Sequence, residues 1–262
     1  MSAGQTNESP APQAKRSYLL WVIGIVLLAI ILLVFVVPLL TVRMKMAGKV
    51  QLTLEPQTAT EISSDTMAEL ARVLQQRADV LGLEGTYIHK QDNRVIIAFK
   101  PVDELDAAVA VLSKRGDLNV YGVPEGYSRD IKLEQIYLVG PSGERAPAED
   151  VLKDVEPIVR RTDLRTDAKL ESDLESGRPV LRIFLDTPAN QALAAWYAGH
   201  KGSDLAIAFD RKAISVAPMT RLIQGHINIQ GIFTREEAKT MVACLKTDPL
   251  PIDLRALAPR LP

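Results

Sequence analysis

Apolar and polar residues alternate regularly after Gly48 and predict a first group of strands and helices. Strands are indicated where every second residue is apolar, and helices where apolar residues recur three and four positions apart. Thr66 and Glu69 have the spacing of a capping box at the start of the first helix, and Gly82 is placed to end it. The expected elements are strands at 50–54, 86–90, 94–99 and 118–121 and helices at 65–82 and 103–116.

The order of this first group, β-α-β-β-α-β, predicts a ferredoxin-like domain. Two helices on one face of an antiparallel sheet bury such a pattern compactly. Glycine and proline between 122 and 126 indicate a boundary. The expected fold class is therefore α+β. A ferredoxin-like base domain (48–122 plus 248–258) would carry an inserted α+β head subdomain (130–247), and one transmembrane helix would precede both.

The inserted segment has its own pattern of strands and helices. Thr187 and Pro188 predict a helix start, and Thr234 with Glu237 forms a second capping box. The segment from Ala213 to Phe233 predicts two strands. The further expected elements are helices at 148–161, after 187 and after 234, and strands at 180–185, 205–209 and 252–257, of which the last would return to the base sheet.

One strand in the 213–233 segment has two chemically different faces. Ile227 and Ile229 point to one side and His226, Asn228 and Gln230 to the other, because side chains alternate along a strand. The isoleucine face is expected to pack on the helix that starts near Thr234. The uncharged polar face is a candidate partner-binding surface for varied polypeptide, and a merely solvated face is the alternative.

The N-terminal part of the chain divides into a polar tail and an apolar segment. Residues 1–14 are small and polar and are expected to be disordered. The uncharged run at 18–42 would form a helix of about 37 Å, enough to cross a hydrocarbon core of about 30 Å. A cleaved signal peptide is the alternative, but its apolar core is typically about 7–15 residues. The run is therefore expected to anchor the chain in a lipid bilayer.

Composition and charge exclude several classes of function. The 262 residues have a formal net charge of −1, which argues against nucleic-acid binding. A single cysteine, Cys244, excludes an internal disulfide and a cysteine-built metal site. His89, His200 and His226 do not have metal-ligand spacing, and a Cys244–His226 nucleophilic pair is a minor alternative. We therefore expect no catalytic residues, no metal, no cofactor and no small-molecule ligand.

Two groups of local strings resemble the first extracytoplasmic domain of SecD, the subunit that works with SecF beside the bacterial protein-export channel. The first is R-A-D-V-L-G and the strands after it, where SecD carries R-V-D-x-L-G. The second lies in and after the 213–233 segment, where SecD carries V-I-S-x-P, I-x-G-x-F-T-x-E-x-A and L-P. The matching residues are Arg77, Asp79, Leu81, Gly82, Gln91, Arg94, Val95, Ile97, Ile214, Ser215, Ala217, Pro218, Ile229, Gln230, Gly231, Phe233, Thr234, Glu237, Ala238, Leu250 and Pro251.

The resemblance covers roughly residues 48–257 and implies an extracytoplasmic base and head on the bacterial cytoplasmic membrane. Basic residues flank both ends of the 18–42 run, so the flanking charges alone do not settle its orientation. The D-L-x-G-G string of SecD is reduced to Gly48. SecD continues into further membrane helices that couple proton flow to movement. Because this chain ends at Pro262, we expect a single-pass protein and do not carry the pump activity over.

The expected function is that of a non-enzymatic accessory of protein export. Its partners would be unfolded secretory polypeptide or subunits of the export channel. The alternative is a scaffold or regulatory module that reuses the SecD fold outside protein export, because a fold does not fix a function.

Overall fold

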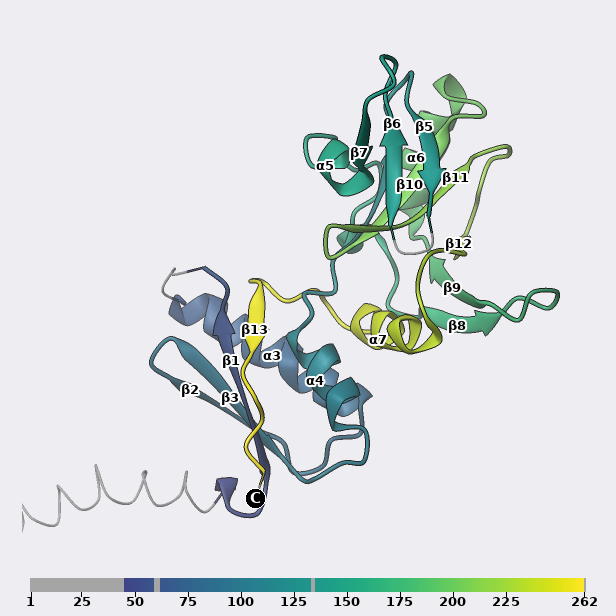
Figure 1. Cartoon of the computed structure of the whole chain (residues 1–262). Helices are drawn as coiled ribbons and strands as arrows, with labels where there is room; N and C mark the ends of the chain where they lie inside the picture. The colour runs from purple at the N-terminus through teal and green to yellow at the C-terminus, as the bar shows by residue number, and fades with distance from the viewer. Residues whose placement is uncertain (1–44, 59–61, 133–134, 262) are drawn as a thin grey trace, which may run out of the picture. The chain divides into compact units, whose positions relative to one another are not determined.

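The computed structural model describes residues 45–58, 62–132 and 135–261 (Figure 1). The tail expected at 1–14 and the membrane segment expected at 18–42 lie outside the described residues. Among the residues described, no helix combines the length and apolar character needed to cross a bilayer. Lys49–Pro262 forms one compact unit.

The first sheet of this unit combines residues from both ends of the sequence. Its strands are β1 (Val50–Pro56), β2 (Tyr87–Gln91), β3 (Arg94–Phe99) and β13 (Leu254–Ala256), in the spatial order β13-β1-β3-β2 with all neighbours antiparallel. Helices α3 (Ser64–Val80) and α4 (Leu105–Ser113) pack with it (Figure 1). We call this four-stranded sheet, together with α3 and α4, the base.

The core of the base is largely aliphatic, with Phe99 as its fully buried aromatic side chain, and the C-terminal segment completes it. Side chains from β1, β3, α3 and α4 meet in it, and Leu250 and Leu254 from the far end of the chain are equally buried. The strand expected at 252–257 is thus present as β13, paired with β1. The sequence could predict this strand because apolar residues recur at 252–257, after the segment that forms the head.

The elements between α4 and β13 form the second part of the compact unit, which we call the head. It contains three sheets of three strands each in the described part of the chain. Four helical segments, of which η2 is a 3₁₀ turn, connect them or pack on them. The strand orders are β11-β10-β4, β12-β9-β8 and β5-β6-β7. The bounds are β4 (Leu118–Gly122), β5 (Ser128–Ile131), β6 (Ile136–Val139), β7 (Arg145–Pro147), α5 (Ala148–Leu152), η2 (Arg161–Asp163), β8 (Lys169–Ser172), β9 (Pro179–Phe184), α6 (Thr187–Gly199), β10 (Asp204–Phe209), β11 (Lys212–Pro218), β12 (His226–Ile229) and α7 (Arg235–Leu245).

Strand β4 lies in the head, whereas the sequence pattern placed it in the base. It pairs with β10 from Leu118 opposite Phe209 to Gly122 opposite Leu205. Leu118 and Val120 are fully buried in the head core. Alternation shows which side chains of a strand face a core, but not which sheet edge offers its backbone partners. Residues 118–122, which were expected to belong to the base, thus pair with a strand of the head.

Two helix predictions were wrong in detail. Helix α5 ends at Leu152 instead of near 161, because Pro157 cannot donate a helical hydrogen bond and the chain instead runs along β4, where the Ile158 amide donates to the Val120 carbonyl at 2.8 Å. Helix α3 begins earlier than expected, with Ser63 as N-cap accepting from the Thr66 amide. The capping box at Thr234 and Glu237 is confirmed at the start of α7.

Gly231 sits where the chain passes from β12 to α7 beside β11. A Cβ atom at this position would lie 2.0 Å from the carbonyl oxygen of Ile214. That oxygen accepts from the Ile232 amide at 2.9 Å, so it cannot withdraw without loss of the bond. The glycine of the I-Q-G-I-F-T string is thus required by close backbone approach.

We expect Gly231→Ala to lower the free energy of unfolding by about 1–3 kcal/mol, toward the upper limit because the obstructing atom is backbone. Gly199→Ala is the matched control, because a Cβ atom there meets nothing within 4 Å. The control should stay within about 0.5 kcal/mol of the parent in urea unfolding. Equal stability of both variants would contradict the steric explanation.

Candidate functional site

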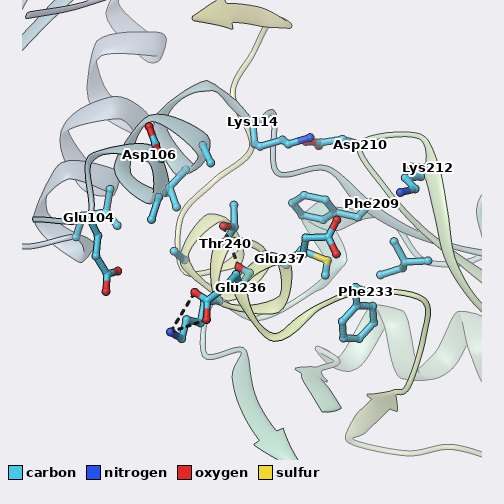
Figure 2. A pocket seen from close by; sticks show the side chains of 18 of the residues that line it. Glu104, Asp106, Lys114, Phe209, Asp210, Lys212, Phe233, Glu236, Glu237 and Thr240 are labelled. Atoms are coloured by element: carbon cyan, nitrogen blue, oxygen red, sulfur yellow. Dashed lines mark hydrogen bonds and ion pairs between the residues drawn. The ribbon is translucent and has the colours of Figure 1, made fainter. Parts of the chain in front are cut away.

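A cleft of about 880 Å³ lies between α4 and α7 (Figure 2). The turn between β10 and β11 and the residues Ile232 and Phe233 before α7 complete its wall. Helix α4 belongs to the base, whereas α7, β10 and β11 belong to the head. The cleft therefore depends on the contact between α4 of the base and α7 of the head.

The floor of the cleft is apolar. Val111, Phe209, Ile214 and Met241 contribute to it and are almost completely buried in the head core. More open side chains surround them and remain accessible from the cleft. These half-buried lining residues are Leu81, Leu105, Ala107, Ala110, Ile232, Phe233 and Ala243. Such a surface binds apolar side chains by removing them from water.

The rim of the cleft is charged and its two ends differ. Asp103, Glu104 and Asp106 lie at the start of α4. Lys114 and Lys212 lie beside the β10–β11 turn, and Figure 2 shows Glu104 and Asp106 on the side opposite Lys212. A bound molecule therefore meets only carboxylates at the start of α4 and a mixture of ammonium and carboxylate groups at the other end.

Other charges around the cleft are already engaged. Lys239 forms an ion pair with Glu236 at 3.0 Å. Glu237 accepts from the Thr234 amide at 2.7 Å as part of the capping box. Within the described residues, the side chains of Asp103, Glu104 and Asp106 make no such bond. They are the carboxylates of the rim that a partner can reach.

A buried arginine closes the C-terminal end of α4. Arg77 on α3 is fully buried, and its guanidinium donates to the carbonyls of Val111 at 2.8 Å, Arg115 at 2.7 Å and Lys114. The last carbonyls of a helix have no partner within the helix. Burial lowers the pKa of Arg77, and the hydrogen bonds to carbonyls offset part of that cost.

A second buried arginine closes the C-terminal end of α7 in the same way. Arg161 donates to the carbonyls of Leu245 at 2.8 Å and Thr247 at 2.6 Å, and burial lowers its pKa too. Thr247 also connects the two arginines, because its hydroxyl accepts from Arg77 Nε at 3.3 Å. Both helices that line the cleft are thus fixed at one end by a buried guanidinium.

Asp210 fixes the neighbouring crossing between α4 and β4. It has a positive φ of 49° in the β10–β11 turn, and its Oδ1 accepts from the amides of Gly116 at 2.8 Å and Asp117 at 2.9 Å. Burial raises the pKa of this carboxyl group, while the two amide donors act against the rise. The turn that carries Phe209 into the cleft is therefore attached to the segment after α4.

The polar face singled out in the sequence lies elsewhere, on β12. Ile227 and Ile229 are buried, as the alternation predicts, in the head core that also contains Met241 and Leu245 of α7. His226, Asn228 and Gln230 are exposed. Their partner-binding role stays a prediction.

Two of these three side chains make hydrogen bonds within the head. Asn228 Oδ1 accepts from Arg182 Nε at 2.8 Å, and Gln230 Nε2 donates to Asp173 at 3.1 Å. The His226 ring lies 6.1 Å from that of Phe184. These hydrogen bonds link β12 to β9 and to the β8–β9 turn. Both amide side chains therefore already have a partner within the head, which a free binding face would not require.

Cys244 is not arranged as a nucleophile. Burial raises the pKa of its thiol to about 11, and Sγ donates to the Val111 carbonyl at 3.7 Å. His226 is exposed on β12, and its ring contact is with Phe184. The described ranges also contain no group of three His, Cys, Asp or Glu residues that could hold a metal ion.

The sequence did not reveal the cleft or the buried arginines. The resemblance drew attention to Arg77 as part of a string, but its spacing on α3 gave no sign that it reaches α4. The cleft residues come from segments around 105, 209, 232 and 241, which only the tertiary structure brings together.

The fold and the sequence motifs together indicate the class of protein. The chain is a mixed α and β protein with several small sheets, and it resembles the first extracytoplasmic domain of SecD. Residues 140–252 match the family model of the SecDF P1 head subdomain. The matched range includes α7 and the β10–β11 turn, and so the head side of the cleft.

Particular relatives confirm the resemblance. The protein translocase subunit SecD of Aquifex aeolicus is 22% identical over 206 residues, which are 77% of this chain and 40% of that protein. A crystal structure of SecDF in a super-membrane-facing form superimposes with a TM-score of 0.65 at 22% identity, over 83% of this chain and 30% of that chain. A structure of SecDF, described as a membrane component that enhances protein export, gives 0.61 at 21%, over 79% of this chain and 98% of that chain. This chain thus spans less than half the length of the relative from Aquifex.

Proposed function

We propose that this chain is a membrane-anchored SecD-like domain that binds polypeptide in the cleft between α4 and α7 and catalyses no covalent reaction. The run at 18–42 would hold it in the bacterial cytoplasmic membrane by a single pass, with the domain, including a ferredoxin-like base, outside the cytoplasm. Its work would be to assist protein export by holding emerging polypeptide or a subunit of the export channel.

The cleft is the observation that carries this proposal. Its volume of about 880 Å³ is near the upper end of the range of about 300–1,000 Å³ for small-molecule pockets. Small-molecule sites usually add a few buried polar groups that converge on the ligand. Here the buried arginines point to backbone carbonyls, and the floor is apolar. Such a cleft suits several apolar side chains of a polypeptide better than one polar metabolite.

The first test fills the cleft. Ala107 lines it and is half-buried on α4, so Ala107→Trp places an indole in the binding volume. We expect recovery of unfolded secretory polypeptide, measured by cross-linking to the detergent-solubilised chain, to fall by about tenfold, or about 1.4 kcal/mol. Ala195→Trp, at an exposed position on α6, should leave recovery unchanged.

A second variant separates the cleft from the polar face of β12. Asn228→Ala with Gln230→Ala should cost at most about 0.5 kcal/mol per site, because both side chains are exposed. Polypeptide recovery should be that of the parent. If this double variant lost recovery while Ala107→Trp kept it, the binding surface would be β12. Recovery of an unrelated partner in place of polypeptide would favour the scaffold alternative.

A further inference from the structure

We infer that the cleft selects polypeptide segments in which apolar residues are flanked by a lysine or arginine, and that this basic side chain lies over the start of α4. The inference rests on the proposed function, because it specifies the polypeptide that the cleft would hold. It follows from the asymmetric rim, which a purely apolar groove would not need.

The start of α4 is more negative than the helix itself requires. Asp103, Glu104 and Asp106 carry three formal charges, whereas a helix N-terminus offers about half a positive charge. Glu104 is the N-cap residue, yet its side chain makes no capping hydrogen bond. A net negative potential therefore remains at this edge, directly beside the half-buried Leu105.

The opposite end of the cleft lacks this excess of negative charge. Lys114 and Lys212 line it together with the carboxylates of Asp210 and Glu237, which accept hydrogen bonds from backbone amides. Phe209 lies between the two ends, and Phe233 borders the floor on the Lys212 side (Figure 2). A segment with apolar residues over the aromatic rings and a cation toward Glu104 matches both the floor and the rim.

The selectivity should be moderate and sensitive to salt. Exposed ion pairs contribute little individually, but the three carboxylates lie along one edge and add to its negative potential. Such rim charges are screened as ionic strength rises. The formal net charge of the whole chain is only −1, so the overall charge cannot account for a strong preference for lysine peptides. Such a preference would come from the carboxylates at the start of α4.

The test uses fluorescent peptides with a common core of alternating leucine and serine. They carry a pair of lysines, glutamines or glutamates at one end, and their binding to the detergent-solubilised full chain is followed by anisotropy. The test variant is Asp103→Asn/Glu104→Gln/Asp106→Asn. The control, Glu125→Gln/Asp150→Asn/Asp154→Asn, changes net charge equally at exposed positions outside the cleft.

The lysine peptide should bind the parent chain about tenfold more tightly than the glutamate peptide at low salt, a difference of about 1.4 kcal/mol. The cleft variant should reduce this ratio to about twofold or less, and the control variant should preserve it. A ratio unchanged in the cleft variant, or reduced equally in both variants, would overturn the inference. If all three peptides bound equally and Ala107→Trp abolished this binding, the inference would be overturned but the proposed function would stand. Failure of every peptide to bind would overturn both.

Discussion

Replacing Arg77 by methionine is expected to lower the free energy of unfolding by about 3–5 kcal/mol, because buried hydrogen-bonded groups would lose their charged partner. Methionine fills a similar volume but cannot donate to the carbonyls of Val111, Lys114 and Arg115. The change would also free the hydroxyl of Thr247 from its bond to Nε. A domain with a total stability of about 5–15 kcal/mol would lose much of it.

Arg72→Met is the matched control for this experiment. Arg72 lies on the same helix and makes ion pairs with Glu69 and Asp248, but both pairs are open to solvent. Exposed ion pairs contribute little to stability, so the control should unfold close to the parent in urea. If the two variants proved equally stable, Arg77 would not be the group that holds the end of α4.

A chain that ends at Lys246 is expected to lose the cooperative unfolding of the base. The cut removes Leu250 and Leu254, which are buried in the base core, together with the pairing of β13 to β1. Truncating a buried leucine costs about 2–5 kcal/mol, so the two together approach the whole stability of a domain. The edge of β1 would also be left with unpaired backbone groups.

The matched control ends at Arg260 and keeps β13 and the backbone pairing between Gln51 and Arg260. Its thermal transition should coincide with that of the full chain. Truncation after Lys246 should abolish or strongly lower the transition followed by circular dichroism. A chain ending at Lys246 that melts at the parent temperature would show that the base is stable without its returning strand.

The sequence by itself determined most of the local structure, because these features depend on residues close together in the chain. Alternation identified β1, β3 and β9, and helical spacing identified α3 and α4. The Thr234–Glu237 capping box fixed the start of α7, and the isoleucines of β12 were assigned to the buried face. Ordered strings such as I-Q-G-I-F-T also carried the resemblance to SecD.

Only the tertiary structure decided where these elements meet. Whether β4 pairs in the base or with β10 depends on which sheet edge is free, and no local pattern records that. The reach of Arg77 to the end of α4 depends on packing between segments nearly forty positions apart. The cleft depends on still more distant segments, since α7 lines it opposite α4. Local sequence fixes which faces are apolar, whereas a binding surface arises where the folded chain leaves such faces partly uncovered.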